Sequence, residues 1–87
     1  MDIKITKDTL DGSNWTNVEF SAPRNGLDHD KITWLQALQH KHNLAGGSGK
    51  ERLSKYQNDS VTKNYKTVYI ENPTVDFEKD LMLWRMS

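Results

Sequence analysis

The glycine-rich run 46–50, with the sequence Gly-Gly-Ser-Gly-Lys, is the first segment whose residue types could do chemistry. A phosphate-binding loop needs the pattern G-x-x-x-x-G-K-[ST] between a strand and a helix. Leu44 occupies the position of the first glycine, and Glu51 occupies the position of the magnesium-binding hydroxyl. We therefore expect no nucleotide hydrolysis, and we expect residues 45–49 to form a mobile loop, because glycines are costly to order.

Histidines and carboxylates around the predicted main helix are the second candidate group. His40 and His42 are two positions apart, and on a helix such residues point roughly 200° away from each other, so they cannot share one metal ion. We expect His42 to be partly packed and His40 to be solvated. Asp28 and Asp30 flank a third histidine, but helix capping explains these carboxylates better than metal binding. The sequence predicts no metal site.

Residues for covalent or acid–base catalysis are also sparse. The chain has no cysteine, and no serine stands in a nucleophile-elbow context. The carboxylates Asp76, Glu78 and Asp80 fall in an expected turn, where they form a solvated acidic edge. We therefore expect a protein that is not an enzyme and that uses no cofactor.

Charge is unevenly distributed although the net charge is zero. Residues 1–30 contain three basic and six acidic residues. Residues 31–66 contain seven basic and two acidic residues, and residues 67–87 contain two basic and four acidic residues. Lys and Arg bind phosphates and aromatic rings stack on bases, so the basic middle is a candidate nucleic-acid or acidic-patch surface. Its candidate residues are Lys50, Arg52, Lys55, Tyr56, Lys63, Tyr65 and Lys66.

Tryptophan, methionine and arginine side chains mark a second candidate surface, because these types are enriched in protein interfaces. We expect Trp34 to lie in the core on the apolar face of the main helix. The candidate partner-binding residues are Trp15, Trp84, Arg85 and Met86, although a core position is the favoured role of Trp84.

Composition indicates one small, ordered domain of 87 residues. The mean hydropathy is −0.86 and 34% of residues are hydrophobic, but three tryptophans argue against a disordered chain. No segment resembles a signal peptide or reaches the ~20 apolar residues that span a bilayer. We expect a cytoplasmic protein that does not bind membranes.

Alternating apolar residues predict strands at Ile3–Thr6 and Trp15–Ala22, joined by a long loop into a hairpin. Apolar residues at helical spacing predict one main helix from Asp28 or Asp30 to about Asn43. A second pair of strands is expected at Lys66–Glu71 and Leu81–Met86.

Between them, Ser48 and Glu51 fit a capping box and predict a short helix over Lys50–Gln57, with a flexible loop as the alternative. The expected fold is therefore α+β, ββα(α)ββ, with a mostly antiparallel sheet of about four strands and one main helix packed on a face.

These features favour a small binding protein that acts by occupying a macromolecular partner. The expected partner is a protein, alone or in a nucleoprotein complex, and phage-type inhibitors of host or defence machinery, such as anti-CRISPR proteins, are typical of the class. One alternative is a nucleic-acid-binding regulator that uses residues 50–66. A second alternative is a structural or assembly subunit that associates through Leu81–Met86.

Overall fold

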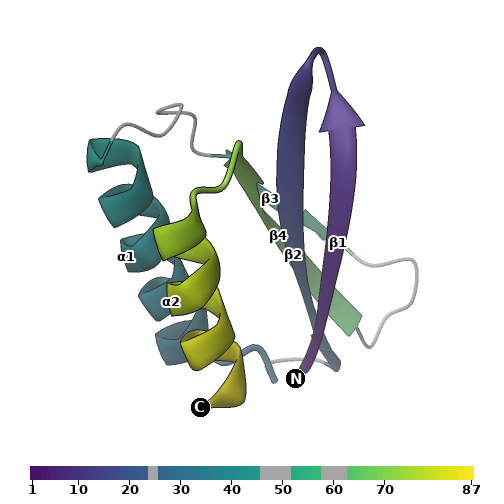
Figure 1. Ribbon diagram of the computed structural model, residues 1–87. Helices are drawn as coiled ribbons and strands as arrows, with labels where there is room; N and C mark the ends of the chain where they lie inside the picture. Colours follow the sequence, from purple (N-terminus) through teal and green to yellow (C-terminus); the bar gives the residue numbers. More distant parts are fainter. Residues whose placement is uncertain (24–25, 46–51, 58–62) are drawn as a thin grey trace.

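The computed structural model describes residues 1–23, 26–45, 52–57 and 63–87, with 52–57 and 63 described by their backbone alone. The strands form one antiparallel sheet in the order β1-β2-β4-β3, and both helices lie on one face of it (Figure 1). The protein is thus a small α+β fold, as predicted. Its elements are β1 (Asp2–Leu10), β2 (Ser13–Pro23), α1 (His29–Leu44), β3 (Arg52–Gln57), β4 (Lys63–Glu71) and α2 (Val75–Met86).

The first two strands form the predicted hairpin, but a tight turn replaces the expected long loop. Asp11 and Gly12 have φ angles of 52° and 79°. Positive φ at both central residues is the geometry of a type I′ turn, whose twist matches that of paired strands. Pairing therefore continues to Leu10 and Ser13, the two residues beside the turn.

The core lies between the sheet and the helices. Val18 pairs with Val68 in the two central strands, and both side chains are fully buried. Phe20 lies next to them, 5.9 Å from the ring of Trp84 in an edge-to-face contact. Because successive strand residues point to opposite faces, alternate residues of β2 and β4 supply this core.

Helix α1 begins where the sequence predicts it. Asp28 is the N-cap, and its carboxylate accepts the backbone N–H of Lys31 at 3.0 Å. Ile32 and Leu35 are buried against the sheet, but Trp34 is 43% exposed. The prediction that Trp34 is a core residue is therefore wrong: it lies two positions from Ile32, on the outer side of the helix.

The C-terminal segment is a helix, so the predicted strand Leu81–Met86 is wrong. Thr74 caps α2 by accepting the N–H of Phe77 at 3.1 Å. The buried residues Phe77, Leu81 and Trp84 follow at spacings of four and three, which is the period of a helix face. Asp76, Glu78 and Asp80, predicted to lie in a turn, are part of the helix, and the first two favour its N-terminal turn through the helix dipole.

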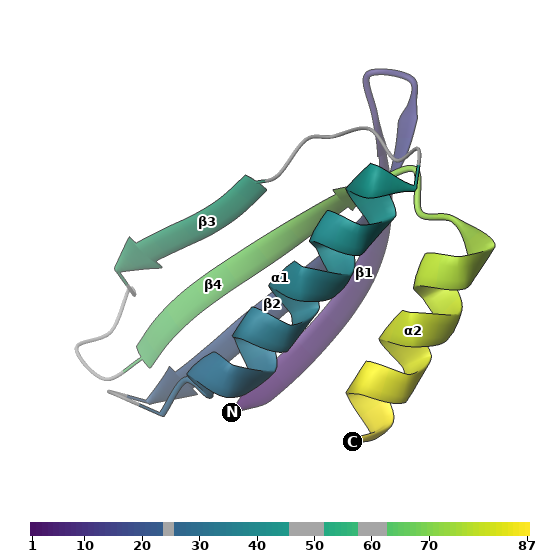
Figure 2. The same ribbon diagram turned by 90° about the vertical axis from the view of Figure 1, so that its left-hand side faces the viewer.

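Within the segment predicted as a short helix over 50–57, the described residues 52–57 form strand β3, which pairs with β4 from Arg52↔Tyr69 to Gln57↔Asn64. The predicted helix is therefore wrong, and so is the expectation of a single main helix. The two helices run antiparallel, side by side, on one face (Figure 2). The predicted glycine-rich loop and the Ser48–Glu51 capping box lie almost wholly outside the described residues.

Candidate functional site

Helix α2 carries two apolar stripes, and only one of them is buried. The inner stripe of Phe77, Leu81 and Trp84 is at most 4% exposed. We call the other the outer stripe: Val75, Met82, Leu83 and Met86, which are between 64% and 79% exposed. A helix on the surface of a globular protein normally has one apolar face. Exposed apolar side chains that gather on one face can mark an interaction surface.

A clamp between the helices fixes the orientation of α2 at its C-terminal end. The Lys31 ammonium donates to the backbone carbonyls of Trp84 and Ser87, and it lies 4.8 Å from the Trp84 ring centroid. In return, Trp84 Nε1 donates to the carbonyl of Lys31 at 2.9 Å. A cation at a helix C-terminus also interacts favourably with the helix dipole. The inner stripe is thus held inward, and the outer stripe faces away from the core.

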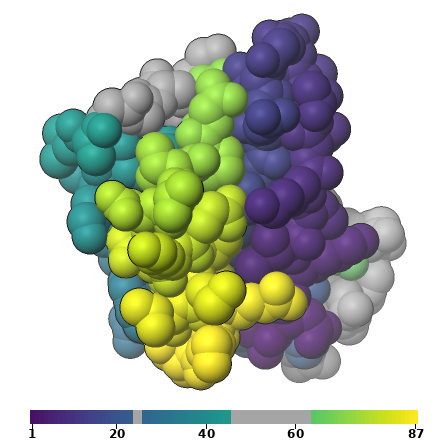
Figure 3. All heavy atoms as spheres, in the orientation of Figure 1, coloured from purple at the N-terminus to yellow at the C-terminus, as the bar shows by residue number. Residues whose placement is uncertain are grey.

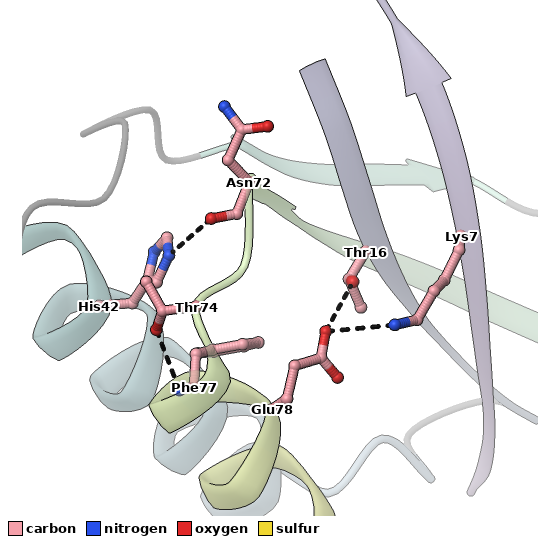
Figure 4. Close-up of polar contacts among 7 residues, drawn as sticks. All are labelled: Lys7, Thr16, His42, Asn72, Thr74, Phe77 and Glu78. Carbon is pink, nitrogen blue, oxygen red and sulfur yellow. Dashed lines mark hydrogen bonds and ion pairs between the residues drawn. The ribbon is translucent and has the colours of Figure 1, made fainter.

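On its other side α2 contacts the first strand (Figure 4). Lys7 Nζ lies 3.3 Å from Glu78 Oε1, and the Thr16 hydroxyl donates to the same oxygen at 3.5 Å. These contacts place Glu78 over the β1 side of the sheet. Figure 3 shows the resulting face, along which β1 and α2 lie side by side.

The turn that precedes α2 is tied to the hairpin and to α1. Asn72 has a φ of 47°, and it exchanges hydrogen bonds with Asn14: its N–H donates to the Asn14 carbonyl at 2.6 Å, and its Oδ1 accepts the Asn14 N–H at 3.0 Å. The carbonyl of Asn72 lies 3.3 Å from His42 Nε2 (Figure 4). His42 is buried and His40 exposed, as predicted.

A cleft of about 870 Å³ opens between the hairpin and the start of α2. Its lining is mostly polar and combines hydroxyl and amide groups with the Lys7–Glu78 ion pair. These groups can hydrogen-bond to another chain. The lining residues are Lys7, Asp8, Thr9, Asn14, Trp15, Thr16, Asn72, Pro73, Thr74, Val75 and Glu78.

The predicted partner-binding residues divide into two groups. Met86 and Arg85 are exposed on α2, and Met86 belongs to the outer stripe. Trp84 is completely buried, which is the core position favoured for it, and Trp15 is 6% exposed, so neither side chain is part of the exposed surface. Sequence reasoning missed Val75 and Met82, although their spacing of seven, and of four more to Met86, is a helical signal.

The predicted basic surface is described only in part. Tyr65 and Lys66 are neighbours in β4 and therefore lie on opposite faces of the sheet. They do not form one platform. The side chains of Lys50, Arg52, Lys55, Tyr56 and Lys63 lie outside the described residues.

Three comparisons with known proteins give no relative. The chain matches no protein-family model and has no significant match among curated proteins or solved structures. Within the described part of the chain, neither helix is long and apolar enough to cross a membrane. The described side chains also include no group of three or more His, Asp or Glu placed to hold a metal ion.

Proposed function

We propose that this chain is a small, non-enzymatic binding protein that acts by occupying a partner protein, with the outer stripe of α2 as its contact surface. The exposed second stripe carries the proposal. Met82 and Met86 stay in solvent on a helix whose other face is fully packed. Methionine side chains are adaptable and are enriched in protein interfaces.

Charges beside the outer stripe indicate the chemistry of the partner. Lys79 and Arg85 are exposed on α2, and neither forms an ion pair with any described residue. A partner surface that complements them has an apolar centre bordered by carboxylates. Such complementary charges mainly raise the association rate and select the correct partner.

A narrower form of the proposal is a phage-type inhibitor of host or defence machinery, similar in action to anti-CRISPR proteins. An inhibitor of this kind needs a rigid surface and no catalytic group. Expression in a bacterial strain with CRISPR immunity, followed by plaque counts of a targeted phage, tests this form. Restored plaques that are lost with Met82→Glu would support it, and unchanged immunity would contradict it.

Site-specific crosslinking tests the general proposal. A photoreactive amino acid replaces Met82, and in a control it replaces Leu44, which is 77% exposed on α1. We expect a crosslinked partner at position 82 only. Binding of that partner, once purified, should be lost with Met82→Glu and retained with Leu44→Glu. Equal crosslinking at both positions, or full binding by Met82→Glu, would refute the outer stripe as the contact surface.

The nucleic-acid alternative makes a different prediction. A phosphate-binding surface would give affinity that falls steeply with salt. Fluorescence anisotropy of labelled DNA and RNA at low and near-physiological salt measures this directly. Salt-dependent binding that survives Met82→Glu but is lost with Lys66→Glu would favour the alternative, and no binding at low salt would remove it.

A further inference from the structure

The outer edge of β1 offers unpaired backbone groups in a regular pattern. β1 is the terminal strand of the sheet and pairs only with β2 among the described strands. In a two-residue hairpin, the residues beside the turn form a hydrogen-bonded pair, and such pairs then alternate along the strands. The groups of Leu10 and every second residue before it therefore turn toward β2. Those of Ile3, Ile5, Lys7 and Thr9 turn outward.

This edge is open over three of its four outward residues. The N–H of Thr9 donates to Asp8 Oδ1 at 2.7 Å, so one donor is already occupied at the hairpin end. Among the described residues, no partner occupies the outward donors and acceptors of Ile3, Ile5 and Lys7. The register with β2 is continuous from Asp2 to Leu10, and the strand has no proline. Proline and bulges are common protections of strand edges, and β1 has neither.

Two residues of the outer stripe, Val75 and Met82, lie toward the same edge. Val75, Glu78 and Met82 are spaced by three and four residues, so they share one side of α2. Glu78 contacts Lys7, which makes this the side that faces β1. Met82 is one helical turn from Glu78 on this side of α2, so it lies toward the position that an added strand would occupy.

We propose that the β1 edge and the outer stripe together bind one extended segment of the partner, which adds to the sheet as an antiparallel strand. This inference rests on the proposed function. Strand addition is an established mode of peptide recognition, in which the backbone supplies affinity and alternate side chains supply specificity. Residues of the segment on the helix side would contact Met82 and Ile5.

Side chains on the other face of β1 determine the sequence of the segment. Lys4 and Asp8 alternate with Ile5 and Lys7, so they lie on the opposite face of β1 from those residues, and neither forms an ion pair with another described residue. Opposite charges directly across two strands stabilise the pairing. An antiparallel segment meets Asp8 first, so the preferred order is basic, apolar, β-branched, apolar, acidic.

A second copy of the chain does not fit this edge, although Lys4–Asp8 itself has a similar pattern. α2 lies on the β1 side of the molecule and extends beyond the strand (Figure 2). Two β1 strands paired about a two-fold axis would be about 4.8 Å apart. Packed helices need about 8–10 Å between their axes, so the two α2 helices would collide.

Peptide binding to the full chain tests the inference. The probe is a short labelled peptide centred on Lys-Val-Thr-Val-Glu, and its control carries Glu-Val-Thr-Val-Lys. Lys7→Pro removes one outward N–H, whereas the matched variant Lys7→Ala keeps it, and both lose the ion pair with Glu78. We expect the probe to bind Lys7→Pro about tenfold more weakly than Lys7→Ala, which corresponds to one hydrogen bond.

Two further measurements make the result decisive. The paired variant Lys4→Glu with Asp8→Lys leaves the backbone unchanged and should prefer the control peptide. Amide exchange of Ile3, Ile5 and Lys7 should slow when the probe binds. Equal affinity of Lys7→Pro and Lys7→Ala, no preference between the peptides, or no peptide binding would overturn the inference. A dimer of the chain that is dissociated by Lys7→Pro would also overturn the inference, because a second copy would then occupy the β1 edge. The outer stripe is tested separately, by crosslinking at position 82.

Discussion

Adjacent residues on α2 should respond in opposite ways to the same substitution. Leu81 is 4% exposed in the inner stripe, and Met82 is 64% exposed in the outer stripe. Truncation of Leu81 to alanine leaves a cavity beside Phe77 and Trp84. Truncation of Met82 removes a side chain that solvent already surrounds. The pair therefore tests whether α2 has the two-sided arrangement on which the proposed function depends.

The expected difference is large compared with the stability of a domain of this size. Leu→Ala in a core costs about 2–5 kcal/mol, and a surface substitution changes stability by less than about 0.5 kcal/mol. A domain of 87 residues has a free energy of unfolding of roughly 4–13 kcal/mol. With a urea m-value near 1.5 kcal/mol/M, Leu81→Ala should lower the denaturation midpoint by about 1–3 M, and Met82→Ala by less than about 0.3 M.

Urea titration followed by tryptophan fluorescence measures both midpoints, because Trp84 and Phe20 are in contact in the core. In the partner-binding assay we expect the opposite result. Met82→Ala should bind the partner more weakly, and Leu81→Ala, where it is folded, should keep its affinity. A midpoint that Met82→Ala lowers by the roughly 1–3 M expected for Leu81→Ala would show that Met82 is not on a solvent face. That result would refute the assignment of the outer stripe.

Three further substitutions test the contacts that position α2 and the hairpin. Thr74→Ala should cost about 1 kcal/mol because the N–H of Phe77 loses its cap, and Thr74→Ser should restore it; circular dichroism during thermal unfolding measures both. Lys31→Met should lower the free energy of unfolding by about 1–2 kcal/mol, because the clamp between the helices is lost. Urea titration measures this change, and the control Lys79→Met should leave the stability unchanged. Equal effects of the two substitutions would contradict the clamp. Gly12→Ala should cost about 1 kcal/mol, a fall in Tm of about 4–8 °C, because its φ is 79°; an unchanged Tm would exclude the type I′ turn.

Local periodicity was sufficient to predict the hairpin strands and α1. In β2, apolar residues alternate strictly from Val18 to Ala22, and such a pattern has only one face to bury. For α1, Asp28 supplies a cap and Ile32 begins the apolar repeat. Both signals lie within short segments of sequence, so they do not depend on how distant parts of the chain pack.

The errors arose where a short apolar run is compatible with two periods. Leu81–Met86 is apolar on both sides, which is typical of a central strand and also of a helix with two stripes. The cap at Thr74 and the buried Phe77 favour the helix. Both residues lie before Leu81, so they fall outside the run from which the strand was predicted. At 52–57, pairing with β4 overrides the local capping signal. Such tertiary pairing is invisible in a short window of sequence.

The candidate site was less predictable than the fold because exposure depends on how elements pack. Trp84 and Met86 are two residues apart, yet one is completely buried and the other is 79% exposed. Residue type favours tryptophan as the interface residue. The packing of α2 against Phe20 instead buries Trp84 and leaves Met86 exposed.

The contacts that hold α2 have a consequence for the folding kinetics. Lys7 and Glu78 are 71 positions apart, and Lys31 and Ser87 are 56 apart. Contacts between such distant residues require an entropic cost of chain closure before they contribute stability, so folding should be slower than that of a helical bundle of the same size. Until α2 docks, the sheet leaves Phe20 uncovered. The helix that carries the outer stripe thus also completes the core.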